Sequence, residues 1–159
     1  MRIMRDIILG ISFGVSIAFL SWIVGMIVNL ILMKTRFYSK LSNLNFITSE
    51  KINRKIGIKN IKWVIENTFF KFFNQKIKIK NSKTDFFEIR EEMTRAEISH
   101  LMAFIFVLFF CFYYSLKINI VFGSMIFIIN ILMNLYPSLL QQQNKRRIDK
   151  FTKRHLLRE

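Results

Sequence analysis

The chain has 159 residues, of which 52% are hydrophobic and 18 are Phe, and its net charge is +15. The length is that of one domain, but this apolar content exceeds what a soluble core of that size can bury, which excludes an ordinary soluble domain. Basic loops beside apolar spans account for the positive charge through attraction to anionic lipids, so we expect no nucleic acid partner.

The first apolar run covers residues 7–33 and contains no charged side chain. As a helix this run would extend about 40 Å, which is more than the roughly 30 Å of bilayer hydrocarbon. The apolar part of a secretory signal peptide is shorter, about 7–15 residues, and ends in a cleavage site made of small residues. We therefore predict an uncleaved membrane span over 7–33.

Small residues recur every four positions in this span, at Gly10, Gly14 and Ala18. This spacing places them on one helical face, where they let another helix backbone approach closely. Two interpretations of this stripe are open: a packing seam, against the other spans of the same chain or against a second copy in a homo-oligomer, or the ordinary tolerance of Gly in membrane helices.

The segment 34–98 is too apolar and aromatic for a plain linker. Within it, apolar residues follow helical spacing while charged residues point elsewhere, which predicts an amphipathic helix lying in the membrane interface. The apolar positions are Ile61, Val64, Ile65, Phe69, Phe72 and Phe73.

Two further spans are predicted between Leu101 and Leu140, where the only charged residue is Lys117. A single helix over this stretch would measure about 60 Å, close to twice the hydrocarbon thickness. We place the spans at about 99–116 and 119–140, with a reversal at residues 115–119. The helix before the second span is expected to continue through His100 into it.

The distribution of charged residues predicts the orientation of the chain in the membrane. Residues 34–98 contain 15 Lys or Arg against 7 Asp or Glu, and residues 141–159 contain 7 against 2. Three spans place both basic segments on one side, which the positive-inside rule makes cytoplasmic. The sequence therefore predicts one all-α membrane domain over 1–159, with about three transmembrane helices, a cytoplasmic and interfacial segment 34–98 and a basic tail 141–159.

Polar residues gather where the second span begins and the third ends. Glu97 and His100 are three residues apart and share a helical face. On the third span, polar residues and a proline recur every three or four residues and form a stripe. That stripe consists of Asn130, Asn134, Pro137, Gln141 and Asn144.

An antiparallel hairpin brings these two polar sets to the same depth, where they can face each other. Simpler roles stay open for each of them: Glu97 can pair with Arg95 or with an Arg of the tail, and His100 can bind a lipid headgroup. Asn134 can form an ordinary hydrogen bond between helices, worth about 0.6 kcal/mol in membrane proteins.

Other chemistries find little support. A Glu-x-x-His pair is half of a di-iron bundle site, but that site needs a second such pair and two more carboxylates, which the spans lack. The sequence has no glycine-rich phosphate loop and no His and Cys cluster with zinc spacing. Cys111 lies mid-span, about three helical turns from His100, and is interpreted as a packed thiol. We expect no bound metal or cofactor.

The polar positions carry a family resemblance. The segments TRAEISHLMAFI and NIVFGSMIFIINILMNLYPSLLQQQNKRRI resemble the glycosyl-4,4'-diaponeurosporenoate acyltransferases, small bacterial membrane proteins. The likeness covers about residues 57–150. The family pattern has Ala-Glu-x-x-His, then Asn, a nearby Pro and Gln-Arg-x-Asn-Arg, although Gln142 stands where the family usually has Arg. The matching positions are Glu97, His100, Asn134, Pro137, Gln141, Asn144 and Arg147.

The resemblance implies transfer of a fatty acyl group from a thioester donor to a sugar hydroxyl of a glycosylated carotenoid or a glycolipid in the bacterial cytoplasmic membrane. His100 would act as general base and Glu97 would orient it. Asn134 and Gln141 would stabilise the developing oxyanion. The donor's phosphates would lie against Arg147, Lys145 and the basic segment 71–80. Asn144 and Arg95 complete the predicted substrate-binding set.

Two other functions fit the same pattern. A non-enzymatic membrane subunit or assembly factor could use the polar stripe to bind another membrane protein. A lipid-binding or small-solute transport protein is the third possibility, but three spans without internal symmetry argue against a transporter acting alone.

Overall fold

The computed structural model describes residues 1–58, 60, 63, 67 and 83–156. The part of the chain that it describes consists of helices and connecting turns, without a strand. The elements are α1 (Arg2–Leu32), α2 (Tyr38–Leu41), α3 (Glu50–Lys55), α5 (Lys83–Lys117), α6 (Ile120–Asn130), the π-helix η2 (Ile131–Leu135) and α7 (Tyr136–Leu156).

Within the described residues, three helices are long and apolar enough to cross a membrane: Arg2–Leu32, Phe86–Lys117 and the continuous helix Ile120–Arg154 formed by α6, η2 and α7. The predicted all-α membrane fold with three spanning helices is therefore confirmed. The predicted interfacial helix over residues 61–73 lies outside the described residues, apart from Trp63 and Asn67.

The hairpin between α5 and α6 turns at residues 118–119. Asn119 caps α6, because its Oδ1 accepts a hydrogen bond of 2.9 Å from the backbone N–H of Phe122. Its Nδ2 donates to Asp6 at 2.8 Å and so ties the start of α1 to this turn. An Asn cap therefore supplies the reversal that the sequence marks with neither Gly nor Pro.

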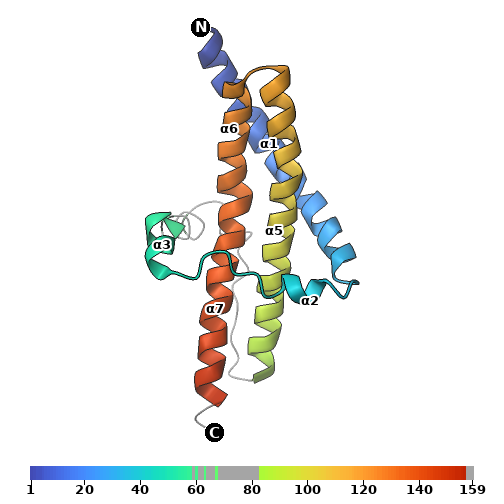
Figure 1. Ribbon diagram of the computed structural model, residues 1–159, viewed down its shortest axis with the longest axis vertical. Coiled ribbons are helices and arrows are strands. Elements are labelled where there is room, and N and C mark those ends of the chain that lie inside the picture. Colours follow the sequence, from blue (N-terminus) through green and yellow to red (C-terminus); the bar gives the residue numbers. More distant parts are fainter. Residues whose placement is uncertain (59, 61–62, 64–66, 68–82, 157–159) are drawn as a thin grey trace.

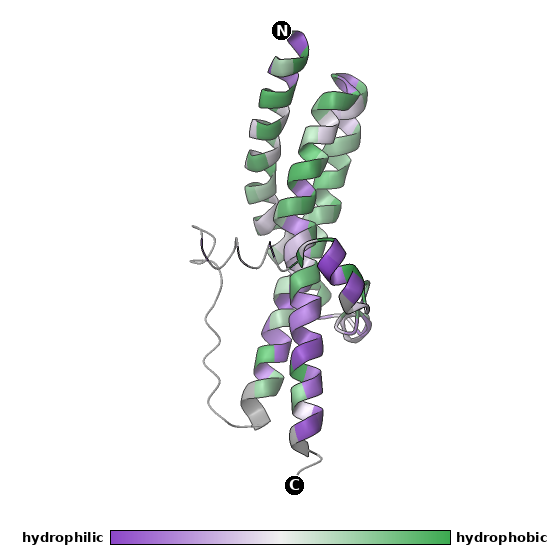
Figure 2. Cartoon of the chain, turned by 90° about the vertical axis from the view of Figure 1, so that its left-hand side faces the viewer, coloured by the Kyte–Doolittle hydropathy of each residue, from purple (hydrophilic) through white to green (hydrophobic). Residues whose placement is uncertain are grey.

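The molecule divides by polarity along its long axis. One half, containing most of α1, α6 and the second half of α5, is apolar, whereas α7 and the first half of α5 are largely polar (Figure 2). These two polar segments run side by side beyond the end of α1 (Figure 1). About 20 residues of α5 separate Glu97 from Lys117, which corresponds to about 30 Å of helix and matches the hydrocarbon thickness. Glu97 therefore lies near the boundary between the two halves.

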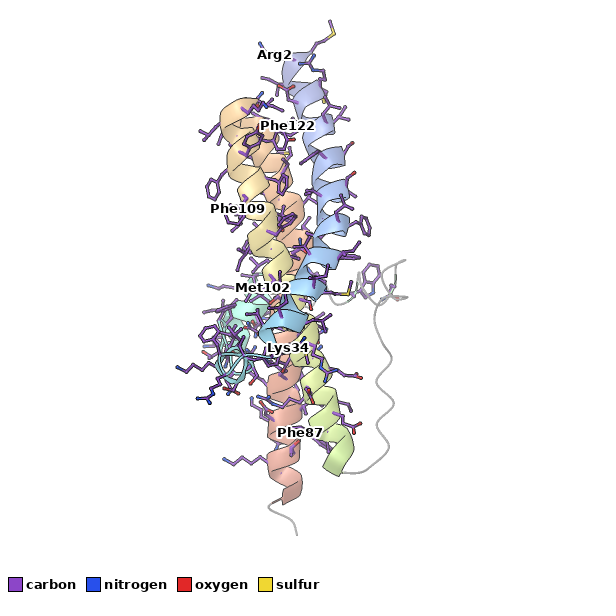
Figure 3. The ribbon with its side chains drawn as sticks, turned by 90° about the vertical axis from the view of Figure 1, so that its right-hand side faces the viewer. Arg2, Lys34, Phe87, Met102, Phe109 and Phe122 are labelled. Carbon is purple, nitrogen blue, oxygen red and sulfur yellow. The ribbon has the colours of Figure 1, made fainter. Side chains whose placement is uncertain are left out.

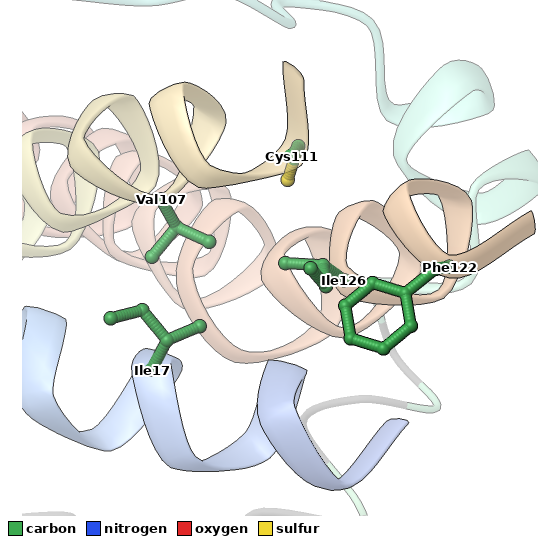
Figure 4. Close-up of a cluster of buried hydrophobic side chains, with 5 residues drawn as sticks. All are labelled: Ile17, Val107, Cys111, Phe122 and Ile126. Carbon is green, nitrogen blue, oxygen red and sulfur yellow. The ribbon is translucent and has the colours of Figure 1, made fainter. Parts of the chain in front are cut away.

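A core of apolar side chains joins the three membrane helices in the apolar half of the molecule (Figure 4). The side chains of this core are Ile17, Val107, Cys111, Phe122 and Ile126. Cys111 is buried among them as a free thiol, in agreement with its interpretation as a packing residue.

The glycines of α1 provide close packing within the chain. A Cβ at Gly10 or Gly14 would lie 2.9–3.4 Å from atoms of α6, and Ala18 is fully buried. The small-residue stripe is thus covered by the chain's own helices, and assembly into a homo-oligomer stays a prediction. Gly25, one turn beyond Ser21, continues the contact against α5.

Gly25 gives the sharpest prediction for this seam. A Cβ at this position would lie 2.2 Å from the carbonyl oxygen of Ser99, so Gly25→Ala forces the backbones of α1 and α5 apart. We expect a loss of about 1–3 kcal/mol in stability, measured as a lowered thermal midpoint in detergent. Gly14→Ala, whose Cβ would come no closer than 3.2 Å to its neighbours, serves as the matched control and should lose less. Equal midpoints for the two variants would contradict this packing.

Candidate functional site

A buried ion pair joins α5 to α7 at the boundary of the apolar half. Glu97 is 0% exposed and Lys145 is 3% exposed, and the Nζ of Lys145 is in salt-bridge contact with Oε2 of Glu97. Lys145 also donates a 2.8 Å hydrogen bond to the carbonyl oxygen of Ser42. Buried charges are rare and require partners because each loses its hydration. The fold therefore holds a carboxylate in a dry position with one cation beside it.

His100 lies one helical turn further along α5, deeper in the apolar half. Its ring meets the indole of Trp22 from α1 edge to face, with the ring centroids 6.0 Å apart. The side chain of Asn134 also interacts with the imidazole. The Nδ1 atom of His100 is buried and has no hydrogen-bond partner. Buried polar atoms without partners are uncommon, and an unpaired ring nitrogen is what a proton acceptor needs.

Asn134 is the centre of a hydrogen-bond network between the three membrane helices. Its Oδ1 accepts a 3.0 Å bond from the indole N–H of Trp22. Its Nδ2 donates to Ser21 Oγ at 3.2 Å and to Asn130 Oδ1 at 2.9 Å. Asn130 in turn donates to the carbonyl oxygen of Phe104 at 3.0 Å. Both amide hydrogens of Asn134 are therefore used inside the protein.

A π-helical turn determines which residues of α7 face the site. The N–H of Tyr136 bonds to the carbonyl of Ile131, five residues earlier, and the next residue, Pro137, has no N–H to restore the α pattern. Such a turn inserts one residue and rotates the following helix by about 100°. The buried face runs through Asn130, Asn134, Ser138, Gln142 and Lys145.

This rotation changes the predicted stripe after Asn134 by one position. The sequence pattern placed Pro137, Gln141 and Asn144 on the inner face, whereas Ser138, Gln142 and Lys145 occupy it. Gln141 and Asn144 are half-buried at the edge of this face. Pro137 indicates a bend in the helix. No residue of the sequence indicates that a π-helical turn adds one residue at this point.

The two predicted arginines lie away from His100. Arg147 is exposed on α7. Arg95 points outward and pairs with Glu91 at 2.6 Å on its own helix, while its backbone carbonyl accepts a bond from Asn29 at 3.1 Å. Of the predicted residues, the structure thus brings His100 and Asn134 into contact and places Glu97 one turn away, against Lys145.

An irregular segment between α2 and α3 crosses the polar side of this site. Lys145 holds the carbonyl of Ser42, and the Oε1 of Gln142 accepts a 2.9 Å bond from the backbone N–H of Phe46. The amide of Gln142 also lies next to Glu97, but its Nε2 makes no hydrogen bond of normal geometry. Segment 42–46 therefore covers the ion pair between Glu97 and Lys145 on the side that faces the polar half of the molecule.

Seen from the side, the site is level with the end of α1. Figure 3 shows Met102 beside α1 and Lys34 just beyond the end of that helix, with Phe87 much further along α5. A shallow groove of about 280 Å³ lies near Phe87, between Arg90 and Lys153. Arg90 is ten residues from His100, or about 15 Å along the helix, so this groove is separate from the buried cluster.

Comparison with known proteins identifies the family of the chain. The chain matches the model of the CrtO family, glycosyl-4,4'-diaponeurosporenoate acyltransferase, over residues 34–154. No curated protein and no solved structure matches it. The matched region contains Glu97, His100, Asn134 and Lys145, whereas Ser21 and Trp22 precede it. Since the match covers well over half of the sequence, the chain belongs to the glycosyl-4,4'-diaponeurosporenoate acyltransferase family.

Proposed function

We propose that the protein transfers a fatty acyl group from a thioester donor to a sugar hydroxyl of a glycosylated carotenoid, or of a related glycolipid, within the membrane. The family match supports acyl transfer to a glycosyl diaponeurosporenoate. The observation that carries the proposal is the unpaired Nδ1 of His100, buried at the end of the apolar half beside an acid and several amides.

His100 is assigned the role of general base. It accepts the proton of the sugar hydroxyl, whose oxygen then attacks the acyl carbonyl carbon. The carbon–sulfur bond of the thioester breaks, and the departing sulfur receives the proton to give a free thiol. Glu97 lies one turn away on the same helix and stabilises the imidazolium electrostatically, because opposite charges attract strongly where water is excluded.

The oxyanion of the tetrahedral intermediate needs hydrogen-bond donors. Asn134 has no amide hydrogen left for this purpose, and Gln141 lies at the edge of the inner face. Ser138 Oγ and Gln142 Nε2 are buried on that face without hydrogen-bond partners. We therefore assign oxyanion stabilisation to Ser138 and Gln142.

The donor is placed on the polar side of the site. Lys145 is buried and paired, so it does not serve as a surface contact for phosphates. Arg147 is exposed on α7 and suits an anionic carrier, and Asn144 lies beside it at the edge of the site. The positive-inside rule makes this side cytoplasmic, which corresponds to the inner leaflet of a bacterial cytoplasmic membrane with its anionic lipids.

A reconstituted assay tests this function. The purified protein in lipid nanodiscs is incubated with a long-chain acyl-coenzyme A and a glycosylated diaponeurosporenoate, and the lipid extract is analysed by mass spectrometry. We expect an ester product heavier than the acceptor by the mass of one fatty acid less one water. The absence of acyl ester, together with stoichiometric co-purification of another membrane protein, would support the non-enzymatic subunit instead.

A further inference from the structure

We propose that α1 is part of the catalytic apparatus, and that Trp22 and Ser21 are positioning residues which act on His100 through Asn134. The inference rests on the proposed role of His100 as the base. Both residues lie outside the region matched by the family model, which begins at residue 34. No sequence spacing connects them to Asn134, more than a hundred positions away.

The direction of the hydrogen bonds fixes the orientation of the Asn134 amide. An indole N–H can only donate, so the atom that it meets at 3.0 Å must be the amide oxygen. The amide nitrogen then faces Ser21 Oγ and Asn130 Oδ1, both of which can accept. Without the indole N–H, the amide can rotate by 180° and present its nitrogen to His100. Trp22 therefore selects one of two amide orientations.

The same indole touches the imidazole directly. The edge-to-face contact between Trp22 and His100 restricts the ring on one side, while the Asn134 side chain meets it on another. An imidazole held by two neighbours keeps its unpaired Nδ1 aimed in a constant direction. Reactions that depend on a positioned base are sensitive to such orientation.

Gly25 allows α1 to pack so close to α5 that Trp22 can contact His100. Its missing side chain lets α1 pack directly against the carbonyl of Ser99 on α5, one residue before His100. Trp22 lies three residues before Gly25 and so shares its helical face. The close approach at Gly25 thus places the indole between α5 and the third membrane helix.

A substitution at Trp22 distinguishes the effect of its hydrogen bond to Asn134 from the effect of its ring contact with His100. Trp22→Phe keeps an aromatic ring against His100 but removes the N–H donor. We expect kcat to fall by about 10- to 100-fold, with KM for both substrates unchanged. Trp63→Phe is the matched control because it makes the same change at an exposed indole, and it should keep full activity.

A double-mutant cycle shows whether Trp22 acts through Asn134. In an Asn134→Ala background, Trp22→Phe should cause little further loss, since the amide that it orients is gone. A full additional loss in this background would overturn the proposal. An equal loss of activity in the Trp63→Phe control would also overturn it.

Fluorescence provides a test that needs no activity. The chain has two tryptophans, so Trp63→Phe leaves Trp22 as the only one. Asn134→Leu in this background removes the acceptor of the indole N–H and should shift Trp22 emission to shorter wavelength. The same change in a Trp22→Phe background should leave the emission of Trp63 unaltered. An unshifted Trp22 emission refutes the inference, whereas a shift in a protein without transferase activity refutes the proposed function alone.

Discussion

Replacing His100 by Gln should lower the rate of acyl transfer by about 10²- to 10⁴-fold, the range typical for loss of a general base. Gln keeps a polar side chain of similar length that can still meet Asn134, so the three membrane helices should pack as before. Its amide cannot accept the hydroxyl proton at neutral pH. Initial rates in the nanodisc assay, with the protein amount normalised after purification, measure the effect.

The chain offers a matched control for this variant. His155 is the other histidine of the sequence and lies near the end of α7, ten residues beyond Lys145. His155→Gln should retain activity close to that of the unchanged protein. If His100→Gln remained fully active, the proton acceptor would have to be another group and the assignment of His100 would be wrong.

Replacing Lys145 by Met should destabilise the protein by about 3–5 kcal/mol, because Glu97 would then be buried without its cation. Met has a similar volume and leaves no large cavity, so the loss reports mainly on the unpaired charge. The thermal midpoint in detergent should fall clearly below that of the unchanged protein. Lys150→Met, at an exposed position on the same helix, is the control and should have little effect on the midpoint.

The double variant Glu97→Met and Lys145→Met separates stability from function. Replacing a buried ion pair by apolar residues is often neutral or even stabilising, so most of the lost stability should return. Activity should not return, because the carboxylate beside His100 is missing. A Lys145→Met protein as stable as the unchanged one would show that the buried pair contributes little to the packing of α5 against α7.

The register of the third membrane helix shows where prediction from sequence stops. Asn130 and Asn134 are correctly placed by helical periodicity, because Asn130 precedes the π-helical turn and Asn134 lies within it, before the register of the helix shifts. Beyond it, the inner face carries Ser138 and Gln142 in place of the predicted neighbours. Hydrogen-bond choice in a helix before a proline depends on packing against other helices, which a single sequence does not reveal.

The partners of the site residues could not be predicted from the sequence either. Lys145 reads as one cation in a basic tail, yet it is buried against Glu97. Trp22 and Ser21 read as part of an apolar anchor, yet they determine the hydrogen bonds of Asn134. A buried lysine or a donating indole becomes recognisable only when the element opposite to it is known.

The sequence by itself determined that the chain is a helical membrane protein with three spans, and that an acid and an imidazole share one helical face where the second span begins. These features follow from hydropathy and from the three-residue spacing, both of which are local properties. Only the tertiary structure decided which side chains meet that face. A single added residue in η2 rotates α7 by about 100°, and the close contact at Gly25 brings α1 alongside, so the composition of the site depends on helix packing.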